Sequence, residues 1–266
     1  MGQLIGVKQM FSRGLEILTA RIIQAGAVRI VATVIALATE AWFARRLVDS
    51  LRVMLPQEMP VSTSNLTEIL QSLPQTLPPE ALMDLIMSPA LWLTAIINIV
   101  VLLWAQGALY LALFPNPKMS SNAEPRSLGS VAVGALGLMF PLVLVNIFYS
   151  VVVFVGTILL IVPCIWLAIK YSFAPLLLAV EDHSAFTAFG RSNELVKRRW
   201  WGVFFRLGVI GLTAGAGFII LRFIPTAGTI LFSIAFPPFL VSCQLAIWES
   251  LKESQAGASG AEARAG

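Results

Sequence analysis

Between Trp92 and Trp248 the chain is apolar almost without interruption, and only prolines and short charged stretches punctuate the run. A run of about 20 apolar residues is long enough to cross the hydrocarbon core of a bilayer as a helix, and this chain contains several such runs. Of its 266 residues, 58% are hydrophobic and 12% are charged. Soluble domains carry about 25% charged residues. The sequence therefore predicts an integral membrane protein.

The apolar runs are hydrophobic on every face, as the stretch from Ile97 to Leu103 shows, so they lack the alternation of membrane β-strands. The predicted fold class is an all-α, polytopic transmembrane helical bundle of about six spans with interfacial amphipathic helices. The expected spans are residues 25–44, 90–113, 140–162, 164–180, 201–223 and 227–248.

The polar stretches predict the segments between these spans. Apolar residues recur every three or four positions over residues 3–22, which predicts an amphipathic helix lying in the membrane interface. We take residues 1–24 as this N-terminal segment and residues 25–252 as the six-span domain. Residues 184–200 predict a second interfacial helix, and the small-residue stretch 127–139 is compatible with another. Residues 45–88 predict an aqueous loop with one or two short helices, and residues 253–266 predict a disordered tail.

The orientation follows from the Lys and Arg residues in the loops, which are in excess on the cytoplasmic side of membrane proteins. With both termini in the cytoplasm, inner segments carry eleven basic residues and outer segments carry three. The inner residues are Lys8, Arg13, Arg21, Lys118, Arg126, Arg191, Lys197, Arg198, Arg199, Lys252 and Arg264, and the outer ones are Arg45, Arg46 and Arg52. The net charge of +4 is explained in the same way, so we expect no nucleic-acid partner.

Charged residues within a span are functional candidates, because a charge in hydrocarbon costs several kcal/mol unless it is paired or hydrated. Four basic residues and one acid qualify: Arg29, Lys170, Arg206, Arg222 and Glu40. Arg206 and Arg222 lie near span ends, where snorkelling explains them. Glu40 and Lys170 lie about 6 and about 9 Å from the outer ends of the first and fourth spans. We predict that these two form an intramembrane ion pair, which either fixes the assembly or belongs to a solute or lipid-headgroup site.

A second candidate site is the run Lys197, Arg198, Arg199, Trp200 and Trp201. Tryptophan rings settle at the level of lipid headgroups, and basic side chains attract anionic lipid. The run therefore predicts lipid-headgroup anchoring at the inner face of the membrane.

Signatures of catalysis and of metal binding are missing from the sequence. Cys164, Cys243 and the single histidine, His183, do not supply the four ligands of a structural zinc site. The chain has no His-Glu-x-x-His, no Gly-x-Ser-x-Gly and no phosphate-binding loop. We predict no catalytic residues, no metal site and no cofactor.

The stretch from Ile161 to Phe204 carries a family resemblance. It resembles bacterial six-span membrane proteins that are often labelled as membrane domains of glycerophosphodiester phosphodiesterases. The residues that match their pattern are Pro163, Ile165, Ala174, Pro175, Glu181, Arg191, Ser192, Leu195, Arg199, Trp200 and Trp201, while Cys164 replaces the usual glycine. The stretch from Ala246 to Lys252 is similar to the family's closing motif. The resemblance implies a six-span architecture in a bacterial plasma (inner) membrane.

In phosphodiesterases of that kind, catalysis belongs to a separate soluble domain, and no stretch here is long or polar enough to be one. We therefore expect no enzymatic activity. The first functional hypothesis is a protein that organises lipids or partner proteins, and the alternative is a transporter or channel component for a small solute. Membrane lipids are the expected partners, and other membrane proteins or a second copy of the chain are left open.

Overall fold

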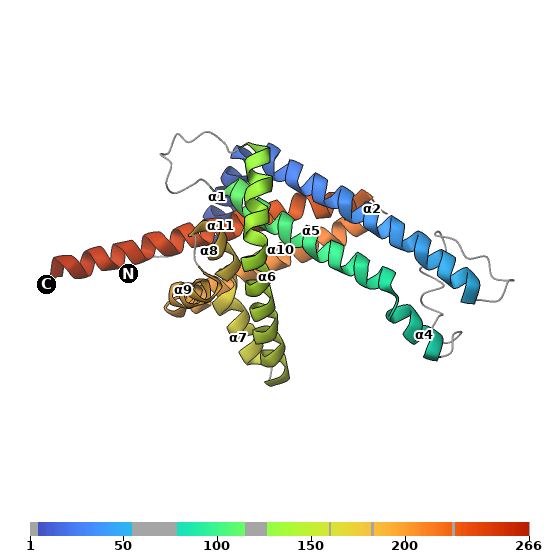
Figure 1. Cartoon of the computed structure of the whole chain (residues 1–266). Coiled ribbons are helices and arrows are strands. Elements are labelled where there is room, and N and C mark those ends of the chain that lie inside the picture. Colours follow the sequence, from blue (N-terminus) through green and yellow to red (C-terminus); the bar gives the residue numbers. More distant parts are fainter. Residues whose placement is uncertain are drawn as a thin grey trace. The chain divides into compact units, whose positions relative to one another are not determined.

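The computed structural model describes residues 5–54, 79–114, 127–159, 161–181, 184–224 and 227–265, and all regular secondary structure within these ranges is helical (Figure 1). Six helical segments there are long and apolar enough to cross a membrane: Ile22–Leu51, Pro89–Leu113, Leu128–Ile158, Pro163–Val180, Trp200–Arg222 and Ala227–Ala256. The predicted fold class is confirmed. The chain divides into two compact units. The first unit comprises residues up to Ile30 and from Leu103 onward, and the second comprises Val31–Leu102.

In the first unit, the N-terminal helix α1 (Val7–Ala20) packs along α11 (Ala227–Ala265) (Figure 1). Met10 and Gly14, one turn apart on α1, are both buried. Gly14 allows the close approach, because a Cβ at this position would lie 2.9 Å from Cys243 Sγ and 3.2 Å from Cys243 Cα. Phe11 stacks on Phe239 of α11 with 5.8 Å between ring centroids. The amphipathic helix predicted at residues 3–22 therefore packs on the sixth span through Met10, Phe11 and Gly14, whereas Val7 and Leu15 of its apolar stripe are exposed.

The third span is part of the long helix α6 (Leu128–Leu159), which packs against α7 (Ile161–Tyr171). Gly156 permits this contact, since a Cβ there would lie 2.8 Å from Cys164 Cα. The stretch at residues 127–139, which the sequence made compatible with an interfacial helix, is helical from Leu128 but is continuous with the third span. Pro141 lies inside α6 and does not end it. Proline removes a single backbone hydrogen bond, and a full interruption would leave more groups unpaired in hydrocarbon.

The fourth span is broken into α7 and the short helix α8 (Ala174–Val180). Pro175 has no N–H to donate to the preceding turn, so helical bonding is interrupted there. Side chains from other helices bond the carbonyls at the break. Ser192 Oγ donates to the Lys170 carbonyl at 2.9 Å, and Gln244 Nε2 donates to the Ser172 carbonyl at 2.8 Å. Non-helical backbone at membrane depth is tolerated where protein groups pair it in this way.

Helix α9 (Ala185–Lys197) corresponds to the predicted interfacial helix, and Ser184 caps its start by accepting a hydrogen bond from the Thr187 N–H. α10 (Trp200–Arg222) follows and packs against α11. The core of the first unit lies around α8, whose side chains are buried against α9. The largest fully buried side chains of the unit include Phe173, Leu176, Leu177, Leu178, Leu195, Leu245 and Ile247.

The predicted disordered tail differs from the structure. α11 continues through residues 253–265 as one helix. Five of these thirteen residues are alanine, the best helix former, and none is proline, which would end the helix. The glycine, alanine and serine content had suggested disorder, but the helix continues beyond the span.

The second unit contains α2 (Ile22–Met54) from Val31 onward, α4 (Pro79–Ile86) and α5 (Pro89–Leu113) up to Leu102. Asn98 Nδ2 of α5 donates to Thr39 Oγ1 of α2 at 3.3 Å and to its own helix at the Thr94 carbonyl at 3.0 Å. The start of the predicted aqueous loop, residues 45–54, is helical in α2. Arginine and leucine are good helix formers, so these charged residues do not end the helix. α4 is one short helix of that loop, and the remainder of the loop lies outside the described residues.

Candidate functional site

Three of the predicted lipid-anchoring residues are held on the turn between two helices. α9 ends at Lys197, Arg198 and Arg199 form the connection, and α10 begins at Trp200. Because this connection is only two residues long, the three cationic side chains start from a single turn of backbone. Together with part of α7 they line an open groove of about 690 Å³. We call it the basic–aromatic groove, lined by Ile165, Trp166, Lys197, Arg198, Arg199, Trp200, Trp201, Gly202 and Phe204.

The aromatic wall of the groove is built across two helices. Trp200 Nε1 of α10 donates to the Trp166 carbonyl of α7 at 3.3 Å. The Trp200 ring stacks on Phe204, one turn further along α10, with 5.3 Å between centroids. Trp201 is 66% exposed. The groove therefore combines cations with exposed indole surface, which suits an anionic group at a membrane surface.

Lys170 lies beside the same groove. Its Nζ stands 4.4 Å from the centroid of the Trp166 ring, one turn earlier on α7. Lys170 lines a smaller pocket of about 170 Å³ with Trp166, Asn193, Val196, Lys197 and Trp200. The structure thus places Lys170 of one predicted site beside Lys197 and Trp200 of the other. We expected the start of the fourth span at the outer face and residues 197–199 at the inner face. Ile165 and Trp166 line the same groove as Lys197, so one of these two placements is wrong.

The predicted partner of Lys170, Glu40, lies in the second unit. The ion pair between them therefore stays a prediction. Within the first unit, the surroundings of Lys170 are cationic and aromatic. They favour the second interpretation that the sequence left open, a lipid-headgroup site.

Two other in-span arginines bond backbone carbonyls. Arg29 donates from Nε and Nη2 to the Ser233 carbonyl, at 2.9 and 2.6 Å. Pro237, four residues after Ser233, has no N–H to donate to that carbonyl. Arg206 donates to the Ile5 carbonyl from Nε and Nη2, and so holds the start of α1. Snorkelling had been our explanation for Arg206, but in the structure its guanidinium bonds within the protein.

Glu181, a residue of the family resemblance, joins three elements at the end of α8. Its carboxylate lies 2.6 Å from Lys252 Nζ of α11 and 4.0 Å from Arg191 Nε of α9. The Glu181 side chain is only 14% exposed. Lys252 Nζ also stands 4.3 Å from the centroid of the Trp248 ring. The arrangement ties α8, α9 and α11 together and indicates a structural role.

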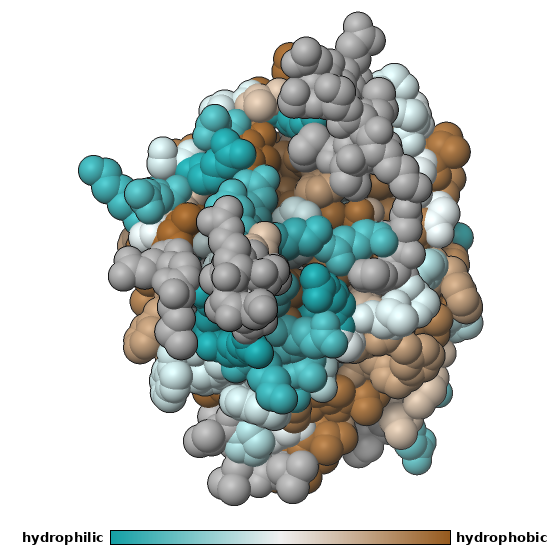
Figure 2. Space-filling model, turned by 90° about the vertical axis from the view of Figure 1, so that its left-hand side faces the viewer, coloured by the Kyte–Doolittle hydropathy of each residue, from teal (hydrophilic) through white to brown (hydrophobic). Residues whose placement is uncertain are grey.

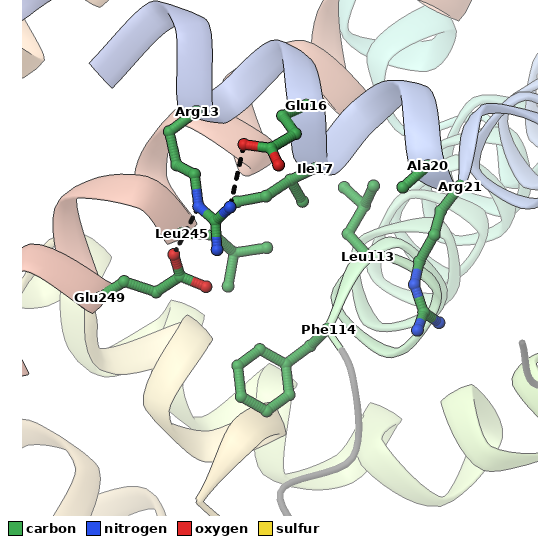
Figure 3. Close-up of a pocket in the computed structure, with 9 residues that line it drawn as sticks. All are labelled: Arg13, Glu16, Ile17, Ala20, Arg21, Leu113, Phe114, Leu245 and Glu249. Atoms are coloured by element: carbon green, nitrogen blue, oxygen red, sulfur yellow. Dashed lines mark hydrogen bonds and ion pairs between the residues drawn. The ribbon is translucent and has the colours of Figure 1, made fainter. Parts of the chain in front are cut away.

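A further pocket of about 190 Å³ lies between α1, α11 and the end of α5 (Figure 3). Arg13 bonds there to two carboxylates, Glu16 at 2.9 Å and Glu249 at 3.2 Å. These bonds raise the pKa of Arg13 above its ordinary value. Because two acids face this one arginine, the pocket suits an anion less well than the basic–aromatic groove does. Arg21, at the other end of the pocket, donates to the Ala112 carbonyl at 3.4 Å.

Sequence reasoning missed Trp166 and Asn193 as parts of the site. A signal was present, because residues four apart share one face of a helix. Trp166 stands four residues before Lys170, and Asn193 stands four residues before Lys197. The pairing of α7 with α9 that brings these faces together is a long-range contact, and spacing along the chain does not reveal it.

Among the described residues, no group of three or more His, Cys, Asp or Glu side chains is placed to hold a metal ion. Comparison of the chain with protein family models, with characterised proteins and with solved structures finds no match.

Proposed function

We propose that this integral membrane protein is non-enzymatic and organises anionic lipids at the inner face of a bacterial plasma membrane. The observation that carries the proposal is the basic–aromatic groove, which is lined by Lys197, Arg198 and Arg199 together with Trp166, Trp200 and Trp201. Each basic side chain near an anionic membrane surface contributes about 1 kcal/mol of attraction. Three of them on one turn give a local site for lipid headgroups.

Contacts within the first unit support a shared side for both termini and α9. The Ile5 N–H donates to Ser250 Oγ of α11 at 3.2 Å, and Lys252 of α11 pairs with Glu181 just before α9. Seen from the side where α9 and the C-terminal part of α11 lie, hydrophilic residues gather near the middle of the face (Figure 2). Together with the excess of basic residues, this grouping supports the proposal that both termini are cytoplasmic.

This topology predicts opposite accessibility for two positions. In a chain whose Cys164 and Cys243 are replaced by alanine, a cysteine at Ser184, which is exposed, should react with a membrane-impermeant maleimide only after the cells are opened. A cysteine at Glu80, exposed on α4, should react in intact cells. Labelling of both positions from outside would overturn the topology.

The alternative, a transporter or channel component, has one observation in its favour. The fourth span is discontinuous, and broken helices in transporters often present free backbone groups to a solute. Here the carbonyls of Lys170 and Ser172 at the break are already bonded by Ser192 and Gln244. In the sixth span the Ser233 carbonyl is bonded by Arg29. These bonds favour a structural role for the breaks, so we prefer the lipid hypothesis.

The proposal predicts that replacing Lys197, Arg198 and Arg199 together by glutamine weakens binding of phosphatidylglycerol at least about tenfold, because three attractions are lost. The affinity can be measured by native mass spectrometry of the detergent-solubilised protein, with phosphatidylcholine as the neutral lipid. Wild-type affinity should fall as salt is added, since salt screens exposed charges.

The matched control replaces Arg45, Arg46 and Arg52 by glutamine. It removes an equal number of positive charges, but from the second unit. That variant should keep the wild-type affinity. If the wild type binds the anionic and the neutral lipid equally well, the proposed function is wrong.

A further inference from the structure

Asn193, which lines the small pocket beside the basic–aromatic groove, carries an unused hydrogen-bond acceptor among the described residues. Asn193 Oδ1 is buried and has no partner among the described residues. The pocket is lined by Asn193 of α9, Lys170 of α7 and Lys197 at the end of α9. A buried amide oxygen without a partner costs free energy, so native proteins rarely leave one in that state without a reason.

Lys170 in the same pocket has free donors. It is held over the Trp166 ring by a cation–π contact, which uses the charge and none of its three N–H groups. Among the described residues no carboxylate lies within ion-pair distance of its ammonium group. The pocket lining therefore includes a cationic donor, Lys170, and a residue with a neutral acceptor, Asn193, with Lys197 adding a second cation.

We infer that this pocket is a headgroup subsite for an anionic phospholipid whose phosphodiester carries a hydroxyl-bearing alcohol, such as glycerol. Lys170 and Lys197 donate to the phosphate oxygens, and Asn193 Oδ1 accepts from the headgroup hydroxyl. This inference rests on the proposed function, because it names the lipid that the groove selects.

The chemistry of the pocket separates this headgroup from others. An ammonium headgroup also offers donors to Asn193, but it would meet the positive charges of Lys170 and Lys197. A phosphodiester without a hydroxyl would leave the Asn193 oxygen unpaired. The volume of about 170 Å³ is that of roughly five or six water molecules, which suits a headgroup of a few heavy atoms.

The surroundings identify the ligand as a lipid. The pocket shares Trp166, Lys197 and Trp200 with the basic–aromatic groove, so the two lie next to each other. Large apolar side chains of α7 and α10 next to the groove are exposed, namely Ile165 at 40%, Trp201 at 66% and Phe205 at 61%. Both helices belong to candidate spans, so this exposed apolar surface is available to acyl chains.

The test compares dioleoyl-phosphatidylglycerol with dioleoyl-phosphatidylmethanol, which has the same charge and chains but no hydroxyl. Native mass spectrometry of the detergent-solubilised full chain gives an affinity for each, with dioleoyl-phosphatidylcholine as the neutral reference. We expect the wild type to bind phosphatidylglycerol about fivefold more tightly than phosphatidylmethanol, the effect of one hydrogen bond.

The variant Asn193→Leu should lose this preference while its affinity for phosphatidylmethanol stays unchanged. Its control is Asn146→Leu in α6, because the bond that Asn146 makes among the described residues is to its own helix, at the Leu142 carbonyl, and that variant should keep the preference.

The outcomes separate this inference from the proposed function. Equal affinity of the wild type for all three lipids would overturn both. Equal affinity for the two anionic lipids, with both above phosphatidylcholine, would overturn only the subsite. If Asn193→Leu still preferred phosphatidylglycerol to phosphatidylmethanol, the headgroup subsite would also be overturned. Displacement of bound phosphatidylglycerol by soluble glycerol phosphate at a similar concentration would show a site for the free ester, and would contradict the assignment to a lipid.

Discussion

Replacing Arg29 with methionine is expected to lower the free energy of unfolding by about 2 kcal/mol, the range for a lost hydrogen bond to a charged group. Arg29 makes two bonds to the Ser233 carbonyl, and Pro237 cannot donate to that carbonyl. Methionine keeps an unbranched apolar stem and removes both donors. Denaturant titration in mixed micelles measures the change.

A second substitution tests whether the stabilisation by Arg29 depends on the missing N–H of Pro237. In a Pro237→Ala background the alanine N–H can bond the Ser233 carbonyl, so Arg29→Met should cost clearly less there. The comparison is a double-mutant cycle, and a coupling well above about 0.5 kcal/mol is expected. Arg222→Met, at the exposed end of α10, is the matched control and should have little effect. If Arg29→Met lowered the free energy of unfolding equally in the wild type and in Pro237→Ala, Arg29 would not be compensating for the proline.

The second large effect is expected at Gly14, where alanine should destabilise the protein by about 1–3 kcal/mol, the usual cost of overpacking. Its Cβ would lie 3.2 Å from both the backbone N and the Cα of Cys243, so α1 has to move away from α11. Cys243 is fully buried under α1. In a Cys164→Ala background, the Gly14→Ala variant should therefore react faster with a maleimide at Cys243.

Gly211→Ala provides a control with the opposite sign. Gly211 lies inside α10, and a Cβ there meets nothing within 4 Å. Alanine favours a helix over glycine by up to about 1 kcal/mol, so this variant should be stabilised or unchanged. A gain in stability from Gly14→Ala would show that α1 does not depend on the close approach.

The spans were predictable because hydrocarbon imposes a length and a composition that can be counted along the chain. Helix ends were less predictable. Pro141 suggested a boundary inside α6 but did not end the helix, whereas the fourth span is interrupted just before Pro175. The difference lies in tertiary partners. Before Pro175, the carbonyls of Lys170 and Ser172 are bonded by Ser192 and Gln244, and these partners are distant in sequence.

The candidate site was predictable in part. A run of three cations followed by two tryptophans is visible in the sequence, and the structure places it along one groove. Lys170 was singled out because it is a charge inside a span. Its neighbour Asn193 looked like an ordinary polar residue of an interfacial helix, because its burial depends on how α7 and α9 pack.

The central claim, that the basic–aromatic groove holds anionic lipid, is tested most directly by the lipid that co-purifies from native membranes. The wild-type protein is extracted in mild detergent and its lipids are quantified against those of the whole membrane. The same is done for the glutamine variant of Lys197, Arg198 and Arg199 and for the glutamine variant of Arg45, Arg46 and Arg52. The account predicts enrichment of hydroxyl-bearing anionic phospholipid in the wild type and the second variant, and loss of most of that enrichment in the first. A wild-type lipid composition equal to that of the membrane, or equal losses in both variants, would contradict it.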